Sequence, residues 1–374
     1  MPTMPSKPTV AIWKNAWLPK SETFIRDQIE SFEGWKALKL GYFTLPEPLV
    51  QPDYAPYGSG RVSRVGRTVL GTSLFSRGYE RQVRQADACL FHAHFGSGGV
   101  NSLTLSKRLG LPSITTFHGS DATTYGSGNP LLDRRYLSKL KALFDYSSML
   151  LPVSKYVADH LLASGAPAEK IHVHYTGTTV QPWAGPAADQ EGVIFVGRLI
   201  EMKGVADLFQ AVALLPPRFR SVPVKIVGDG PLRDELQKLA ADLNIQAEFL
   251  GWRPHAEVRV LMANSLIFCG PSHHVKAANA EGFGMVYVEA ALQGLPVVGY
   301  SAGGTKEAVQ DGHSGLLVPE RDVSALSSAL ASLLGDGLAA AEMGAAGRSR
   351  AATQFNITTQ TAQLESIYRD VIRL

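Results

Sequence analysis

The stretch VIFVGRLIEMKG at residues 193–204 indicates both the class of the fold and the position of a site. Its four leading apolar residues have the length of a buried strand, and Gly197 directly after them marks a tight turn. Arg198 and Lys203 follow this turn. Two cations around the end of one strand can converge on a single diphosphate, the arginine as a planar fork and the lysine as a point charge. Two solvated surface cations are the alternative.

Short apolar runs of this kind alternate with helical patterns along the whole chain. We predict strands at residues 10–13, 38–43, 88–92, 113–117, 149–153, 193–196, 224–227, 247–250, 266–269, 297–298 and 315–318. An amphipathic helix is expected at 22–32, with Ser21 as its cap, and an alanine-rich helix at 338–352. This alternation is typical of parallel sheets covered by helices. The sequence therefore predicts an α/β protein with two doubly wound, Rossmann-like domains.

The length of the chain supports two domains. Its 374 residues exceed the roughly 250–300 at which single cores stop growing. Residues 181–192 interrupt the pattern with proline, glycine and small residues, which is typical of a linker. We predict a first domain at 1–180, the linker at 181–192 and a second domain at 193–357. Such folds bind ligands beyond the carboxyl ends of their strands, so we expect the site in a crevice between the domains.

The charge of the chain is unevenly distributed. The formal net charge is +3, but residues 1–180 carry 20 Lys and Arg against 13 Asp and Glu, whereas residues 181–374 carry 16 against 20. A basic first half suits an anionic partner, either a phosphorylated acceptor or an acidic membrane surface. An uneven, solvated surface is the alternative. No nucleic-acid-binding motif accompanies the charge, so no nucleic acid partner is expected.

Cysteine content and hydropathy bear on the cellular compartment. Cys89 and Cys269 are the two cysteines, too few for a disulfide framework, so a reducing cytosol is expected. No stretch approaches the ~20 apolar residues of a membrane span, and the N-terminal residues lack a signal-peptide core. We expect a cytoplasmic protein whose membrane contact is at most peripheral, at the inner face.

Six arginines form a cationic stretch in the first half: Arg61, Arg64, Arg67, Arg77, Arg81 and Arg84. Valine and leucine residues are interleaved with the first three. Such a stretch suits anionic lipid headgroups or the pyrophosphate of an acceptor. A solvated helix face is the alternative. Arg61, Arg64 and Arg67 are therefore candidates for contact with an acceptor or a membrane.

Two carboxylates flank a Gly-Phe-Gly turn in the second half. Glu281 precedes the turn, and Glu289 lies within the helical run at 285–292. Free N–H groups at the start of that helix can bind an anion or sugar hydroxyls. One glutamate lies before the turn and the other inside the helix. We therefore expect them to bind different parts of an elongated ligand rather than to act as an acid/base pair. A solvated helical glutamate is the alternative.

Three histidines lie near predicted strand ends. His92 and His94 point to one face of a strand, but no third ligand stands at a diagnostic spacing, so no metal site is predicted. His118, followed by Gly119 and Asp121, is better placed at the mouth of the crevice. A histidine satisfied by the local backbone is the alternative. The Gly-Asp-Gly turn at 228–230 lacks the full phosphate-loop pattern, and we interpret it as structural.

Taken together, these motifs resemble a known family. Listed in order they are FVGRL with Lys203-Gly204, VGDGP at 227–231, FLGW at 249–252, Pro271-Ser272, EGFG at 281–284 with Glu289, GLPVV at 294–298, GGTKE at 303–307 and DGHSGLLV at 311–318. This series over roughly residues 190–355 resembles the retaining GT-B glycosyltransferases of family 4. FHAHFG at 91–96, TFHGSD at 116–121 and residues 19–25 are similar to its subgroup that builds exopolysaccharides of the colanic-acid type. One departure is WLPKSET at 17–23, where many members carry a Gly-Gly loop.

The resemblance implies a role for each candidate residue. Arg198 and Lys203 would neutralise the donor diphosphate as it leaves, Glu281 would face the transferred sugar, and Glu289 would accept hydrogen bonds from the ribose. His118 would approach the donor sugar. The rest of the donor site would consist of Gly197, Trp252, Arg253, Gly282, Phe283 and Gly284, with the turn at 303–305 beside the diphosphate. The C-terminal helix, at about 358–374, would cross back onto the first domain.

The function that the sequence predicts is that of a retaining, metal-independent hexosyltransferase without a cofactor. Its donor would be a UDP- or GDP-linked sugar, and its acceptor a hydroxyl of a glycan or lipid-linked molecule in exopolysaccharide or cell-surface glycan synthesis. Two other functions remain open. One is a GT-B-type nucleotide-sugar epimerase, which needs acid/base carboxylates, and the other is a non-catalytic nucleotide-sugar-binding protein.

Overall fold

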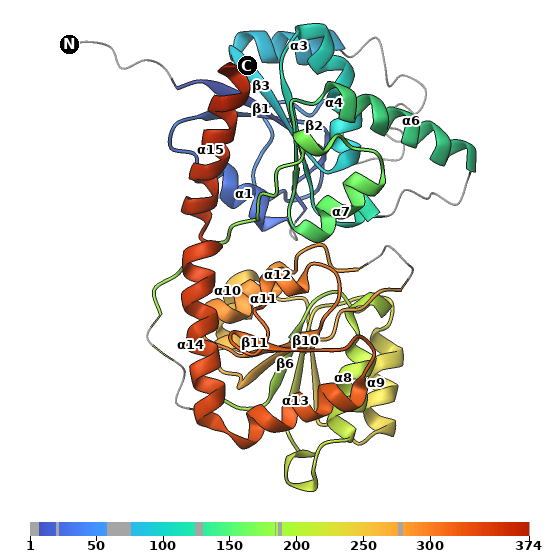
Figure 1. The fold of residues 1–374 in the computed structure, drawn as a ribbon, viewed down its shortest axis with the longest axis vertical. Coiled ribbons are helices and arrows are strands. Elements are labelled where there is room, and N and C mark those ends of the chain that lie inside the picture. Colours follow the sequence, from blue (N-terminus) through green and yellow to red (C-terminus); the bar gives the residue numbers. More distant parts are fainter. Residues whose placement is uncertain are drawn as a thin grey trace, which may run out of the picture. The chain divides into compact units, whose positions relative to one another are not determined.

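The computed structural model describes residues 7–19, 22–57, 76–123, 130–183, 185, 189–275 and 280–373. The chain divides into two compact units (Figure 1). Unit 1 consists of Met1–Thr179 together with Ile357–Leu374, and unit 2 of Val180–Asn356. The first unit is therefore built from two separate parts of the sequence.

The elements of unit 1 alternate between strands and helices. They are β1 Thr9–Trp17, α1 Thr23–Glu30, β2 Lys36–Thr44, α3 Ser76–Gln85, β3 Ala88–His94, α4 Gly96–Leu109, β4 Ser113–Phe117, α5 Ser120–Thr123, α6 Pro130–Tyr146, β5 Met149–Pro152, α7 Lys155–Ala163, the 3₁₀ turn η1 Ala168–Lys170, and α15 Ile357–Arg373. In the described part of the unit, the sheet has five parallel strands in the order β2-β1-β3-β4-β5.

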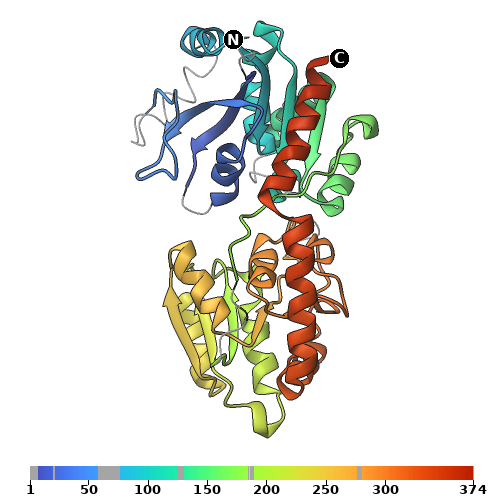
Figure 2. The same ribbon diagram turned by 90° about the vertical axis from the view of Figure 1, so that its left-hand side faces the viewer.

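Both faces of this sheet are covered, as the period-two pattern of β1 shows. Val10 and Ile12 pack with residues of α1 and α15, whereas Ala11 and Trp13 pack with residues of α3 and α4. The red C-terminal helix α15 runs along the strands in both Figure 1 and Figure 2. Every residue from Val10 to Ile12 is fully buried, as expected of a strand inside a doubly wound sheet.

The first helix differs slightly from its prediction. The N-cap position of α1 is Glu22, which makes no side-chain cap hydrogen bond. Ser21, the predicted cap, lies outside the described residues, and the helix ends at Glu30 rather than at residue 32. Phe32 still packs against the core beneath α15, which explains why its apolar side chain extended the helical pattern.

Unit 2 repeats the alternation. Its elements are β6 Val193–Val196, η2 Glu201–Lys203, α8 Val205–Ala213, η3 Pro217–Phe219, β7 Val224–Val227, α9 Arg233–Asp242, β8 Ala247–Gly251, α10 His255–Ala263, β9 Ile267–Gly270, α11 Met285–Leu292, β10 Val297–Tyr300, α12 Thr305–Ala308, β11 Gly315–Val318, α13 Val323–Gly335 and α14 Gly337–Gln354. Within the described residues, six parallel strands are ordered β11-β10-β9-β6-β7-β8.

The described residues of the predicted linker pack onto unit 2. The guanidinium of Arg348 lies 4.6 Å from the ring centre of Trp183, and the Trp183 ring fills the space beside Gly294. The Gln190 amide donates to the carbonyl of Ala263 over 3.0 Å. These contacts attach the segment to unit 2 and move the boundary between the units to residues 179 and 180.

The hydropathy of the described helices bears on membrane insertion. None of them alone is long and apolar enough to cross a membrane. Only α13 and α14 taken together reach the required length and composition, and they are bent by 103° relative to each other.

Candidate active site

The order of the strands fixes where a site belongs in unit 2. β6 and β9 are neighbours in the sheet, but the chain leaves them toward opposite edges, to β7 and to β10. Such a reversal opens a crevice beyond the carboxyl ends of the two strands. The loop after β6 carries Arg198 and Lys203, and the segment after β9 carries Glu281. Three of the four residues predicted to be catalytic therefore follow the two strands of the reversal.

The turn after β6 is held by the neighbouring glycine turn. The Gly197 N–H donates to the Val227 carbonyl over 2.9 Å. Gly228, with φ of +128°, lies so close that a Cβ there would stand 1.9 Å from the Gly197 carbonyl oxygen. The Gly-Asp-Gly turn thus supports the loop by close packing. Arg198 itself is exposed and makes no ion pair with any residue that the structure describes.

Lys203 and Glu281 form an ion pair between Nζ and Oε2. Their side chains are only 14% and 16% exposed, so the pair is largely sheltered from water. The two residues are 78 positions apart in the sequence, where nothing indicated direct contact. Lys203, expected at the diphosphate, and Glu281, expected at the transferred sugar, therefore contact each other directly.

The turn that follows Glu281 is packed against a second glycine turn. The Gly304 N–H donates to the Glu281 carbonyl over 2.8 Å, and a Cβ on Gly304 would stand 2.1 Å from the Gly282 carbonyl oxygen. Gly284, in the left-handed region at φ +91°, begins α11 without a side-chain cap. Phe283 is buried with its ring 5.1 Å from that of Phe355, so its side chain anchors the turn in the core.

Glu289 lies inside α11 and is paired with a residue that the sequence did not suggest. Its Oε1 is 3.1 Å from Nε2 of His255, and Nδ1 of that histidine is 3.0 Å from an Arg259 nitrogen. His255 opens α10 directly after the predicted base-bordering loop. Within that loop Trp252 is 56% exposed, and Arg253 forms an ion pair of 3.7 Å with Glu257. No motif spacing links His255 to Glu289, which explains why the pairing was missed.

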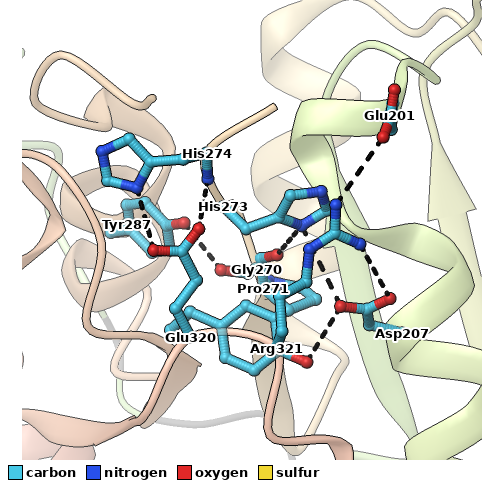
Figure 3. A network of polar contacts seen from close by, with 10 residues as sticks. Glu201, Asp207, Gly270, Pro271, His273, His274, Tyr287, Glu320 and Arg321 are labelled. Atoms are coloured by element: carbon cyan, nitrogen blue, oxygen red, sulfur yellow. Dashed lines mark hydrogen bonds and ion pairs between the residues drawn. The ribbon is translucent and has the colours of Figure 1, made fainter. Parts of the chain in front are cut away.

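A buried aspartate anchors the loop that carries Lys203. Figure 3 shows Arg321 between Asp207 and Glu201, at 3.8 and 3.6 Å. Asp207 also accepts a hydrogen bond from Tyr300 over 3.0 Å and lies 3.9 Å from His273. Because Glu201 belongs to η2, these contacts tie the Lys203 loop to the exits of β9 and β11. None of these residues was a candidate.

A second carboxylate in Figure 3 holds the start of the segment after β9. Glu320 accepts from the His274 backbone N–H at 2.5 Å and pairs with its ring nitrogen at 2.8 Å. Burial alone would raise the pKa of Glu320, but these hydrogen bonds outweigh it and lower the pKa below its ordinary value. The carboxylate is therefore well suited to remain ionised and to hold this segment.

His118 lies in unit 1, directly after β4, whereas the other described candidates lie in unit 2. Asp121 fixes the turn around it, because its carboxylate accepts N–H groups from His118, Gly119 and Gly96 over 3.0, 2.9 and 2.8 Å. Burial nevertheless raises the pKa of Asp121, and the three hydrogen bonds oppose that shift. The motif that contains His118 therefore forms a rigid turn.

The His118 ring meets the second histidine of β3. Nε2 of His118 is 3.1 Å from Nδ1 of His94, with the two rings stacked. Phe95 and Phe24 also contact the His118 ring, at 4.5 and 5.0 Å between centres. Burial, followed by the nearby Lys14 charge, lowers the pKa of His118 to about 3. His118 is therefore neutral at physiological pH.

The predicted arginine contacts and the prediction about metal binding concern other parts of the chain. Arg61, Arg64 and Arg67 lie outside the described residues, so their predicted role stays a prediction. Among the residues that the structure describes, no group of three or more His, Cys, Asp or Glu side chains is arranged to hold a metal ion.

Comparison with known proteins identifies relatives of both halves of the chain. The family model "Glycosyltransferase Family 4" matches residues 44–181, and "Glycosyl transferases group 1" matches residues 181–350. The amylovoran biosynthesis glycosyltransferase AmsK of Erwinia amylovora is 30% identical over 288 residues, which cover 75% of this chain and 70% of that protein. The putative colanic acid biosynthesis glycosyltransferase WcaL of Escherichia coli is 32% identical over 254 residues, covering 65% of this chain and 61% of its own length.

Solved structures agree with the fold. Anabaena HepE in complex with UDP-glucose superposes with a TM-score of 0.77 at 19% identity, covering 97% of this chain and 99% of that one. Together with the two parallel, doubly wound sheets, this similarity confirms the predicted GT-B fold.

Proposed function

Because this chain belongs to the glycosyltransferases of group 1 and family 4, we propose that it is a retaining enzyme that moves a sugar from a nucleotide diphosphate sugar to a hydroxyl group of a glycan or lipid-linked acceptor. The names of AmsK and WcaL support a role in the synthesis of a bacterial exopolysaccharide. The HepE complex supports a UDP-linked donor, and a GDP-linked donor suits the same cations.

The Lys203–Glu281 pair at the β6 and β9 exits is the observation that carries this proposal. It places a cation and a carboxylate side by side, next to the uncapped start of α11 and in the same strand-exit region as the exposed Arg198. In a donor complex, Arg198 and Lys203 would stabilise the charge that develops on the leaving diphosphate. Glu281 would then face the transferred sugar.

In the proposed reaction, retention of configuration is the outcome that the family resemblance implies. The bond between the anomeric carbon and the diphosphate oxygen breaks, while the acceptor oxygen bonds to the same face of the sugar. The acceptor proton passes to the departing diphosphate oxygen. Glu281 is engaged by Lys203, which argues against a role as a free nucleophile. In this proposal the two cations and the helix start supply the positive charge, without a metal ion.

Replacing the two cations tests the proposal directly. We expect Arg198→Ala or Lys203→Ala to lower the transfer rate by ~10²–10³, by analogy with the loss of one oxyanion-type donor. Lys238→Ala, which removes an exposed lysine of α9, is the matched control and should leave the rate unchanged. Near wild-type turnover by either site variant would show that these residues were assigned wrongly. Epimerisation of the nucleotide sugar without acceptor, or binding without turnover across acceptors, would contradict glycosyl transfer itself.

The proposed role of Glu289 is tested by binding alone. Glu289→Ala should weaken binding of the nucleoside diphosphate by about 10- to 100-fold, since a hydrogen bond to a charged group contributes about 1.5–3 kcal/mol. A nucleotide that lacks both ribose hydroxyls should bind the wild type and the variant equally weakly in calorimetry. If the variant discriminates the two nucleotides as strongly as the wild type does, Glu289 does not contact the ribose.

A further inference from the structure

A chain of three polar side chains from α10 and α11 ends at Glu289, the carboxylate proposed to contact the ribose. Oε1 of Glu289 is 3.1 Å from Nε2 of His255, and Nδ1 of the same ring is 3.0 Å from a nitrogen of Arg259. The sequence predicted a function for Glu289 alone. His255 and Arg259 belong to none of the motifs, so their contact with this carboxylate needs a separate explanation.

The chemistry of Arg259 decides where the proton of His255 lies. A guanidinium has N–H donors and no acceptor, so Nδ1 of His255 must accept this hydrogen bond with its lone pair. The single N–H of the neutral ring is then at Nε2 and donates to Glu289. Each group in such a chain polarises the next, which strengthens the hydrogen bond at the carboxylate. The contact is therefore a directed hydrogen bond that orients the carboxylate of Glu289.

The packing of α10 holds this chain of contacts in place. His255 and Arg259 are four positions apart, the spacing of neighbours on one face of a helix. The buried residues of α10, Val258 and Met262, follow the same spacing, so the two polar side chains border the packed side of the helix. The side chains of His255 and Glu289 are 34% and 19% exposed. Arg259 makes no ion pair within the described ranges, so nothing there draws its guanidinium away from His255.

A carboxylate that is held in this way restricts which nucleotide can bind. Its two oxygens can accept hydrogen bonds from the two neighbouring hydroxyls of a ribose, and their four lone-pair positions leave room for His255 as well. A nucleotide without the 2′-hydroxyl would leave one of these positions unpaired. A mobile glutamate could turn toward water instead, whereas Glu289 is held by His255 and largely sheltered. Sites built to bind a hydroxyl reject analogues without it for this reason.

We propose that His255 and Arg259 are positioning residues that make the nucleotide site select ribonucleotides against 2′-deoxyribonucleotides. Glu289 contacts the ribose hydroxyls, His255 fixes the carboxylate, and Arg259 fixes the ring of His255. This inference rests on the proposed glycosyl transfer and adds a property of its donor. The nucleoside of the donor carries both ribose hydroxyls, and sugars linked to a deoxynucleoside diphosphate are excluded.

Two amide substitutions of His255 separate positioning from packing. The amide of His255→Gln reaches the position of Nε2 and can still donate to Glu289, whereas the amide of His255→Asn stands near Nδ1 and falls short of the carboxylate. Calorimetry would measure the dissociation constants of UDP and 2′-deoxy-UDP, and of GDP and 2′-deoxy-GDP, for each protein. Because the two constants of a pair come from the same protein, an unfolded fraction does not change their ratio. Val260→Ala, which truncates an exposed side chain of α10, is the control.

We expect the wild type, the control and His255→Gln to bind the ribonucleotide about tenfold or more tightly than its 2′-deoxy analogue, as for one hydrogen bond to a charged group. In His255→Asn this ratio should fall to about twofold, and in Arg259→Met to about threefold, because the ribonucleotide loses affinity and the analogue does not. A wild-type ratio in His255→Asn, or an equal loss in His255→Gln, would overturn the positioning role. A wild type that binds both nucleotides of a pair equally would refute this inference alone, whereas one that binds none of the four would refute the proposed function as well.

Discussion

Each neutral histidine has a single N–H group, and this limits how His94 and His118 can share a hydrogen bond. Nδ1 of His94 faces Nε2 of His118, and Nε2 of His94 is buried without a partner among the described residues. An unpaired buried N–H is rarer than an unpaired acceptor. His94 is therefore expected to donate from Nδ1 and to leave its Nε2 lone pair unpaired, which places the proton of His118 on Nδ1.

Two substitutions of His94 separate this tautomer effect from packing. The amide of His94→Asn stands near the position of Nδ1 and can still donate to His118, whereas the amide of His94→Gln reaches toward the unpaired Nε2 position. We expect His94→Gln to lower kcat/KM about tenfold, as for one lost hydrogen bond, and His94→Asn to retain most of the rate. ¹⁵N NMR of the His118 ring should show a changed tautomer in the Gln variant alone. The same tautomer in both would refute the assignment.

The sequence identified His118 but not its partner. The His-x-His pattern placed His92 and His94 on one face, which agrees with ring centres 4.6 Å apart. It did not show that His94 meets the ring of His118, which directly follows β4, because this contact depends on the register between β3 and β4. The Lys203–Glu281 and Glu289–His255 pairs join residues 78 and 34 positions apart on turns and helices, so they were found only from tertiary contacts.

At the scale of elements, the Lys203 loop depends on one glycine between η2 and α8. Gly204 has φ of +70°, and a Cβ there would stand 2.0 Å from the Pro271 carbonyl oxygen. Gly110, at the end of α4, has a similar φ of +64° with nothing within 4 Å of a Cβ. Both glycines adopt the left-handed backbone conformation. Only at Gly204 does a neighbouring backbone lie close enough to clash with a Cβ.

This pair of glycines makes a controlled test of loop position. Gly204→Ala and Gly110→Ala should both lose about 1–2 kcal/mol of stability from the left-handed conformation. Gly204→Ala must in addition move the loop away from β9, and we expect a further fall in transfer rate on the order of 10²-fold. Thermal unfolding and kinetics of both variants would measure this. Equal rates for the two variants would show that the loop position does not limit transfer.

The strands were predicted more accurately than their ends and their order. Short apolar runs identified every strand in the described sheets, since a buried parallel strand has no polar side. β1 continues to Trp17 beyond the predicted residue 13, because its pairing with β2 extends to Thr44. The charged residue that ended the apolar run, Lys14, pairs with Glu22 at 3.1 Å. The order of strands required tertiary contacts, and so did the reversal between β6 and β9 that defines the site.

At the scale of the whole molecule, buried histidines make the stability of unit 1 depend on pH. Burial lowers the pKa of His92, His94, His118 and His174, the last to about 4. Because the unfolded chain binds protons near pH 6.5 and the folded chain does not, stability falls as the pH drops from about 6.5 toward 4. Burial raises the pKa of Glu22 and Asp121, so these two carboxyl groups stabilise the folded chain as the pH falls. They oppose the effect of the four histidines only in part.

The contribution of one histidine is measurable. His174 is buried, and its Nε2 lies 2.9 Å from the Gln360 carbonyl oxygen of α15. His174→Gln keeps a donor there but removes the titration. Calorimetry should show that the stability lost between pH 7 and pH 5 is smaller in this variant by about 2 kcal/mol. His313→Gln, which replaces an exposed histidine of unit 2, is the control and should behave like the wild type. An unchanged pH response in His174→Gln would mean that folding does not lower the pKa of this histidine.

The split of unit 1 across the sequence has a consequence for synthesis on the ribosome. Residues 357–373 are translated after all of unit 2, yet Leu364, Tyr368 and Val371 complete the core of unit 1. The Ile357 N–H bonds to the Thr178 carbonyl over 2.9 Å and thereby closes the loop of chain that contains unit 2. Unit 2 can therefore finish folding first, although it is encoded second. Until α15 emerges, the nascent first sheet exposes an apolar face, so a messenger truncated before this helix would yield a product with one folded half and one that is prone to aggregate.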